Sequence, residues 1–463
     1  MSTLVAIYLF GLSALILLVM VWQHATGKRE FLSLRNAFLI GFVIFQLSSV
    51  GLRMFSREFN GFRMSDPVSA ATEFSMLASV FIAVFFLFYE GGWGVKKLAS
   101  KVPHVPEAHN PAALITLAVL MTLLAVPLRF AFNLPAIGVL ANFLGVGAAA
   151  MACGLVGWVW APRLLNPAMA IFATLFLAVN LVTVMTGSFG RRSILAVFGC
   201  MVWGMYYSHW RYLPARSLLV RFALISAGPV IFLALYTSVR SAAEHDRSAG
   251  EHMSAIQTGG SVTSGLVKLL DGQGTGPAGL WLIEHYPEDY RPRYFFTATY
   301  FVGISVPRVI WPGKPEPLSV LIADQANIRG VQQDRIKLSC GIIGVAAAEG
   351  GIFAAIFYGA CGGLFLRFFE QIARNNVRCV FIVLPIGAAM GQVLGLARGD
   401  TSAFANTYFI TTMGSLALMI PIGRFMTRFE TETPAVFDDY EDGTDEHAEP
   451  DESDYLEDPD QAA

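Results

Sequence analysis

A short run that combines two cations, an indole ring and three prolines lies at 306–315, where the chain reads Val-Pro-Arg-Val-Ile-Trp-Pro-Gly-Lys-Pro. It belongs to a segment of about 100 residues between long apolar runs, and loops of that length are uncommon unless they are functional or disordered. Arg308 and Lys314 could bind an anion, and Trp311 could stack on a sugar ring or anchor the chain at a membrane interface. This loop is therefore the first place to look for chemistry.

Further arginines stand at the ends of apolar segments that we expect to share one face of a membrane. A single arginine in such a position usually snorkels toward water. Several that converge on one face indicate a bound anion such as a lipid-linked pyrophosphate, because each guanidinium keeps its charge and donates paired hydrogen bonds to phosphate. The candidates for this site are Arg191, Arg192, Arg240, Arg308, Lys314 and Arg398.

One carboxylate lies inside an apolar segment, in the run 346–351 (Ala-Ala-Ala-Glu-Gly-Gly). An ionisable side chain within a bilayer is costly and is a functional candidate by default. If the helix begins at Gly341, Glu349 lies about 12 Å along it by helical rise. Glu349 could take up a proton in catalysis, or it could pair with an arginine of the helix bundle.

Two further groups of side chains could take part in proton transfer or sugar binding. Glu284, His285 and Asp289, with Tyr286 among them, bring acids, a base and an aromatic ring together, which suits either role. The same pattern is also that of an amphipathic turn at a membrane interface. Asp400, in the short element Arg-Gly-Asp at 398–400, is a third carboxylate candidate.

The composition predicts a polytopic all-α membrane protein. Of the 463 residues 55% are hydrophobic and 14% are charged, whereas soluble domains have about 45–50% and about 25%. A hydrocarbon core of about 30 Å takes about 20 residues to cross, which gives about 11 spans within a range of 10–12. The candidate spans are 3–23, 34–52, 68–90, 111–132, 135–160, 165–186, 192–207, 217–237, 341–366, 378–397 and 404–426.

These spans divide the chain into four parts. Residues 1–237 hold about eight N-terminal spans, and 341–426 hold about three more. Between them, 238–340 form a large extracytoplasmic loop, in which 294–310 is expected to be interfacial or re-entrant. The tail 427–463 is rich in Asp, Glu and Pro, which predicts a disordered acidic segment. The first span has the sequence of a retained helix rather than that of a cleaved signal peptide.

Lysines and arginines in the short loops predict the orientation, since cationic loops stay in the cytoplasm. Four loops, those of Lys28, Lys96, Arg211 and Arg374, fall on one side, which we take as cytoplasmic. The long loop then lies outside and the tail inside. One loop disagrees, because Arg53, Arg57 and Arg63 would also lie outside. Either they bind something there, or the span count is wrong near the N-terminus.

The cysteines and the overall charge suggest no cofactor and no nucleic-acid partner. The five cysteines are scattered without the spacing of a metal or redox site, so we expect neither a metal centre nor a disulfide framework. The formal net charge is −2, which gives no electrostatic footprint for nucleic acid. The lipid bilayer is the one partner that composition itself implies.

The run 307–315 closely resembles a Pro-Arg-aliphatic-aliphatic-Trp-Pro-x-Lys-Pro signature in the outer loop of the O-antigen polymerase-like family, the Wzy-type oligosaccharide repeat-unit polymerases. Weaker similarities lie at 187–192 (Gly-Ser-Phe-Gly-Arg-Arg), 348–353 (Ala-Glu-Gly-Gly-Ile-Phe) and 396–400 (Leu-Ala-Arg-Gly-Asp). Together they cover roughly 185–405. The family commonly has an aromatic residue and Asn shortly after the Glu, where this chain has Gly350 and Gly351.

The resemblance implies a fold similar to the GT-C-type lipid-donor glycosyltransferases, in a bacterial inner membrane, with the active site facing the periplasm or exterior. The implied reaction moves a growing glycan from undecaprenyl pyrophosphate to a lipid-linked repeat unit. Arginines can stabilise the leaving pyrophosphate without a metal. The resemblance favours Arg191, Arg192 and Arg308, supported by Arg240, Lys314 and Arg398.

The remaining roles stay open at this point. Glu349 is the first choice for the base that takes the acceptor proton, ahead of Glu284 and Asp400, and Trp311, Tyr286 and His285 could bind sugar. A separate co-polymerase could set chain length. An O-antigen ligase would share the spans, outer loop and arginines, and a flippase or transporter of the lipid-linked glycan is the non-enzymatic alternative. Repeated halves with matching broken spans, typical of transporters, are not evident in the sequence.

Overall fold

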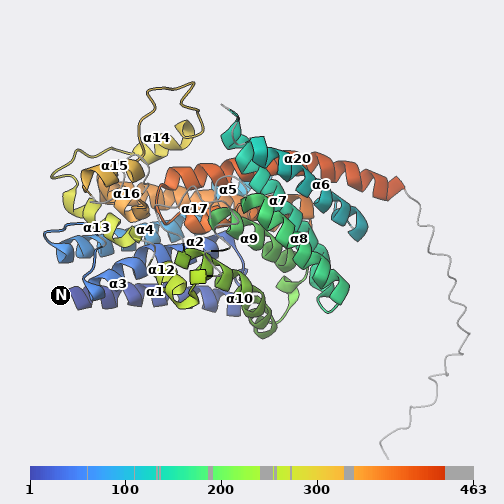
Figure 1. Ribbon diagram of the computed structural model, residues 1–463, viewed down its shortest axis with the longest axis horizontal. Helices are drawn as coiled ribbons and strands as arrows, with labels where there is room; N and C mark the ends of the chain where they lie inside the picture. Colours follow the sequence, from blue (N-terminus) through green and yellow to red (C-terminus); the bar gives the residue numbers. More distant parts are fainter. Residues whose placement is uncertain are drawn as a thin grey trace, which may run out of the picture.

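The computed structural model is an elongated bundle in which most helices run along the long axis (Figure 1). It describes residues 1–59, 61–108, 110–131, 134, 137–185, 191–239, 254, 258–271, 274–327 and 338–432. Throughout these ranges the regular structure is helical and no strand occurs. The prediction of an all-α polytopic membrane protein is confirmed at this level.

Nine helices of the described ranges are long and apolar enough to cross a membrane. Except for α17, each begins within a few residues of the start of a predicted span. They are α1 (Ser2–Ala25), the continuous α2 (Leu34–Phe42), η1 (Val43–Ser48) and α3 (Ser49–Ser56), α4 (Pro67–Gly91), α6 (Pro111–Phe130), α7 (Gly138–Trp160), α8 (Pro167–Met185), α10 (Ala215–Val239), α17 (Ile352–Asn375) and α20 (Thr401–Glu432).

The other two predicted spans also fall on helices, but these do not meet the same criteria. The segment 192–207 is α9 (Arg191–Ser208), and 378–397 is divided into α18 (Val380–Gly387) and α19 (Met390–Gly395). Short helices make up the rest of the described chain. They are α5 (Trp93–Ala99), η3 (Ala161–Arg163), η4 (Trp210–Tyr212), α12 (Val262–Leu270), α13 (Thr275–His285), α14 (Phe296–Gly303), α15 (Leu318–Gln325) and α16 (Gly341–Gly350).

The prediction of one unbroken helix over 341–366 is wrong. Helix α16 stops at Gly350, and α17 starts at Ile352 after a sharp turn. The turn depends on two glycines with positive φ, 146° at Gly350 and 60° at Gly351, a backbone region that side chains with a Cβ rarely adopt. Glu349 therefore lies at the end of a short helix, beside the turn, rather than within a long helix.

Helix α17 packs closely on α4 in the middle of the bundle. A Cβ on Gly359 would lie 2.8 Å from the carbonyl oxygen of Phe81, and one on Gly363 would lie 2.6 Å from that of Phe85. Small residues four positions apart are the pattern that lets two membrane helices approach at backbone distance. The rings of Phe38, Phe81 and Phe85 stack beside this contact and form part of the core.

The cationic loops used to predict orientation do come together at one end of the bundle. Arg211 pairs with Glu30 at 2.9 Å, and Arg35 pairs with Glu90 at 3.3 Å, so the ends of α1, α4 and α9 meet there. One arginine of the loop that disagreed has a structural explanation, because Arg53 pairs with Asp271 and donates to the backbone oxygen of Glu58. Its charge is compensated within the protein.

Candidate functional site

The carboxylate of Glu349 is buried and held by three donors from two other helices. The amide N–H of Thr297 lies 3.0 Å from both carboxylate oxygens, and its hydroxyl donates to Oε1 at 2.6 Å. The hydroxyl of Tyr358, on α17, donates to Oε2. The turn at Gly350 and Gly351 folds Tyr358 back onto Glu349. These bonds offset the cost of burying the carboxylate, whose residue is only 1% exposed.

Two of the side chains that bind Glu349 also line a pocket of about 260 Å³. Thr297 and Tyr358 lie in its wall, together with Phe301 of α14 and several apolar residues of α4 and α17. Ser402, at the start of α20, adds a further hydroxyl. A pocket with apolar walls and a few hydroxyls at one side suits a hydrocarbon chain attached to a polar group.

Arg293 connects Glu349 to the loop that carries the 306–315 run. Its amide donates to the carbonyl of Ala348 at 3.1 Å, and its guanidinium donates to the carbonyl of Glu316 at 3.0 Å. Burial lowers the pKa of Arg293, while the negative charge of Glu349 opposes that shift. The cation stays close to the carboxylate and remains charged at neutral pH.

The two cations of the 306–315 run hold their own loop. Arg308 donates to the carbonyl of Lys314 at 3.0 Å and pairs with Glu316 at 2.5 Å, with its side chain 50% exposed. Lys314 is buried, and its ammonium donates to the carbonyls of Ile304 at 2.6 Å and Val306 at 3.0 Å. Arg308 is therefore the accessible cation of the two.

Asp400 lies next to the same loop, immediately before α20. Its carboxylate accepts from the hydroxyls of Ser319 at 3.1 Å and Ser402 at 3.2 Å. Burial raises the pKa of Cys340 to about 12, and the charges of Asp400 and Glu349 both add to this shift. Both carboxylates thus act electrostatically on the residue that precedes α16.

Tyr300 lies among the charged groups that these contacts bring together. Burial raises its pKa, as do the charges of Asp400 and Glu316, whereas those of Arg308 and Arg293 lower it. Its ring also lies 5.4 Å from the ammonium of Lys314. We call this group the loop site; its members are Glu349, Asp400, Arg293, Arg308, Lys314, Glu316 and Tyr300.

Of the other predicted phosphate ligands, two arginines lie against aromatic rings near the start of α20 and near α2. The exposed Arg192 lies over the ring of Phe404 at 3.8 Å, one turn into α20 from Asp400. Arg398 lies 6.0 Å from the ring of Phe45, in the turn between α19 and α20. Arg191 is the first residue of α9, but its side chain lies outside the description, and Arg240 lies outside the described residues.

The predicted group at the end of α13 makes contacts that anchor the helix. Glu284 accepts from the backbone amides of Ser65 at 2.5 Å and Asp66 at 2.6 Å, which fixes the loop before α4. His285 stacks on Trp281, with ring centres 4.2 Å apart. Tyr286 donates to Gln325 of α15 at 3.1 Å.

Trp311 lies apart from these three, on the loop that follows α14. Its side chain is 41% exposed, and its ring lies against Gly303 at the end of α14. Tyr286 is linked to the loop site, because the charge of Arg293 acts on its hydroxyl. The two aromatic residues therefore lie on different segments, Trp311 on the loop after α14 and Tyr286 just after α13.

No family model, curated protein or solved structure matches this chain. Function has to be inferred from the geometry of the loop site and its pocket. Three residues there were missed in the sequence, namely Arg293, Thr297 and Tyr358. Arg293 had a local signal, since Arg-Pro-Arg directly precedes the apolar segment 294–310. Thr297 and Tyr358 had none, because their proximity to Glu349 depends on the fold.

Proposed function

We propose that this chain is a glycosyltransferase that polymerises lipid-linked oligosaccharide repeat units at the outer face of a bacterial inner membrane. The observation that carries the proposal is the buried Glu349 carboxylate, held by two side chains that line an apolar pocket and joined through Arg293 to the 306–315 loop. Sequence supports the same reading, since this loop resembles the signature of the O-antigen polymerase-like family.

The loop site has the groups that such a transfer needs. The bond between the donor sugar C1 and its pyrophosphate breaks, and a bond forms from the acceptor hydroxyl oxygen to that carbon. Glu349 takes the proton of the acceptor hydroxyl, while Arg308 and Arg293 stabilise the negative charge that develops on the departing undecaprenyl pyrophosphate. The products are the lengthened lipid-linked glycan and the free carrier pyrophosphate, with no metal needed to balance the charge.

The pocket gives the donor lipid a place close to the reacting groups. Its apolar walls suit part of a polyprenyl chain, and its hydroxyls lie on the side of Glu349 and Asp400. Positioning two large substrates accounts for much of the rate enhancement in such transfers. The neighbouring Arg192 and Arg398 are suited to the second lipid pyrophosphate.

The first experiment is polymerisation by the purified full-length protein in detergent. The substrate is the undecaprenyl-pyrophosphate repeat unit of the source organism, given with and without EDTA, and products are resolved by length on a gel. We expect a ladder of products that persists in EDTA.

Two other outcomes would replace the proposal. Transfer only after addition of a lipid A core acceptor would indicate an O-antigen ligase. Absence of any transfer, together with movement of the lipid-linked unit across reconstituted vesicles, would indicate a flippase. A ladder that disappears in EDTA would keep the polymerase assignment and overturn its metal independence.

A further inference from the structure

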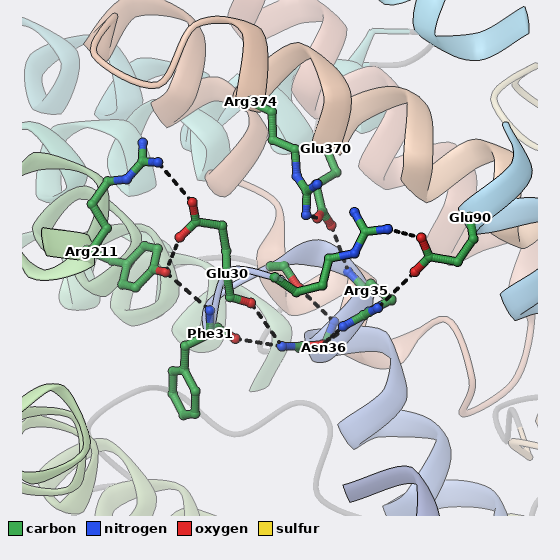
Figure 2. Close-up of polar contacts among 11 residues, drawn as sticks. Glu30, Phe31, Arg35, Asn36, Glu90, Arg211, Glu370 and Arg374 are labelled. Carbon is green, nitrogen blue, oxygen red and sulfur yellow. Dashed lines mark hydrogen bonds and ion pairs between the residues drawn. The ribbon is translucent and has the colours of Figure 1, made fainter. Parts of the chain in front are cut away.

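A second group of charged residues lies at the other end of α17, far from Glu349. Arg367 is about 22 Å along α17 from Ile352 by helical rise. At this end of α17, Glu370 and Arg374 meet the start of α2 at Arg35 and the end of α4 at Glu90 (Figure 2). We call this group the arginine cluster; its members are Arg29, Arg35, Arg367, Arg374, Glu90, Glu370 and Tyr89.

The cluster holds four arginines but only two carboxylates. Glu90 pairs with both Arg29 and Arg35. Glu370 accepts from the guanidinium of Arg374 at 2.7 Å and from the backbone amide of Arg35 at 3.3 Å. Glu30, drawn nearby in Figure 2, is engaged by Arg211 at 2.9 Å and by Tyr206.

Arg367 forms an ion pair with neither of these two carboxylates. It is nevertheless buried, with 5% of its surface exposed. Within the described residues, its Nε and Nη1 atoms are buried and have no hydrogen-bond partner. Its guanidinium lies 5.5 Å from the ring of Tyr89, whose own buried hydroxyl makes no well-aligned hydrogen bond in those ranges and lies near the carboxylate of Glu370. A buried guanidinium without an anion carries a desolvation cost that a bound anion would remove.

The field at this point is strongly positive. Tyr89 has three guanidiniums around its ring, those of Arg367, Arg29 at 5.9 Å and Arg35 at 5.5 Å. Burial and the positive charges of Arg374, Arg367 and Arg35 lower the pKa of Arg29. The side chains of Glu90 and Arg374 are 39% and 22% exposed, so the cluster can be reached from its edge.

We propose that the arginine cluster is a binding site for a phosphate group, with Arg367 and the Tyr89 hydroxyl as the donors at its base. Guanidinium groups recognise phosphate through charge and paired hydrogen bonds, and a tyrosine hydroxyl adds a third donor. The bound phosphate competes with the carboxylate of Glu90 for Arg29 and Arg35. This site is separate from the loop site and does not depend on the function proposed for it.

The test is the thermal unfolding midpoint of purified full-length protein in neutral detergent, titrated with inorganic phosphate against sodium chloride of equal ionic strength. We expect a saturable rise that chloride does not reproduce. Arg367→Gln should weaken the apparent affinity about tenfold, the effect of losing one charge-assisted interaction. The matched control is Arg216→Gln, which removes an exposed arginine near the same end.

A second variant keeps the test decisive if Arg367→Gln does not fold. Glu90→Gln removes the competing carboxylate and should tighten phosphate binding. Equal responses to phosphate and chloride, or unchanged affinity in both variants, would overturn the proposal. The two sources of such a phosphate are a lipid headgroup and a soluble compound. Nanodiscs of phosphatidylglycerol and of phosphatidylcholine distinguish them. Arg367-dependent stabilisation by the anionic lipid assigns a lipid headgroup, and its absence alongside phosphate binding assigns a soluble phosphate compound.

Discussion

Two carboxylates that look equivalent in the sequence have different surroundings in the structure. Glu284 accepts from backbone amides, which fix a loop. Glu349 accepts from the hydroxyls of Thr297 and Tyr358, and both of these side chains face the pocket. A group that exchanges protons with a substrate needs such access. Because these hydroxyls connect its buried carboxylate to the pocket, Glu349 is the better candidate for the base of the proposed reaction, and no local sequence pattern contains that reason.

We predict that Glu349→Gln lowers the rate of polymer formation by about 100-fold or more while the protein remains folded, because general-base catalysis contributes about 10²–10⁴-fold. The measurement is the initial rate of ladder formation beside the unfolding midpoint. Glu73→Gln, at an exposed carboxylate of α4, is the matched control. Normal activity in Glu349→Gln would reject this base, and loss in Glu284→Gln instead would move the role to α13.

At the residue scale, sequence could find groups whose chemistry is unusual for their surroundings. A carboxylate in an apolar run and an arginine beside a tryptophan are visible in that way. Their partners are not, since Thr297 and Tyr358 are ordinary residues for their helices. Arg129 shows the converse: a lone arginine in the last turn of a membrane helix usually snorkels toward water, but Arg129 of α6 is 3% exposed and donates to the carbonyl of Val184 at 2.7 Å.

At the scale of elements, the turn between α16 and α17 decides where Glu349 points. Hydropathy located the apolar segment that the two helices share, because it reports how apolar a segment is. It could not report the break, since two residues such as Gly350 and Gly351 hardly change the mean hydropathy of a long segment. The same limit applies to the division between α18 and α19.

We predict that Gly351→Ala destabilises the protein by about 1–3 kcal/mol, since its φ of 60° and ψ of −128° are nearly exclusive to glycine. No other atom lies within 4 Å of a Cβ built there, so backbone strain rather than a clash is the cause. Activity should fall as Glu349 shifts. The measurement is denaturant unfolding in detergent together with the ladder assay.

The control for this change is Gly11→Ala in α1, where a Cβ also meets no atom within 4 Å and the backbone is helical. Alanine is the better helix former by about 1 kcal/mol, so this variant should be as stable as the original protein or more so. Equal stability of Gly351→Ala and Gly11→Ala would contradict the role of the turn.

At the scale of the whole molecule, cationic loops gather at one end, as their predicted grouping requires, and the side of the membrane that this end faces stays a prediction. The number of lysines and arginines in each short loop was sufficient to group these loops on one side, because that number does not depend on how the helices pack. The internal pairing of Arg53 with Asp271 could not be foreseen, because the partners are far apart in the chain.

This orientation predicts which sites a membrane-impermeant maleimide reaches in intact spheroplasts. Val309→Cys, in the 306–315 run at 78% exposure, should be labelled. Leu165→Cys, between α7 and α8 at 99% exposure, should be labelled only after lysis. The protein without introduced cysteines serves as the background, because Cys361 is exposed. The reverse pattern would invert the topology and place the loop site in the cytoplasm.

The pairing of Arg308 with Glu316 has a consequence for which lipids the loop can admit. A headgroup that reaches Arg308 has to displace a carboxylate already in contact with it. A phospholipid with a single negative charge gains nothing electrostatically from that substitution, whereas a pyrophosphate brings more charge than the carboxylate it replaces. Glu316 would thus set a charge threshold for entry, and the abundant anionic lipids of the surrounding membrane would fall below it.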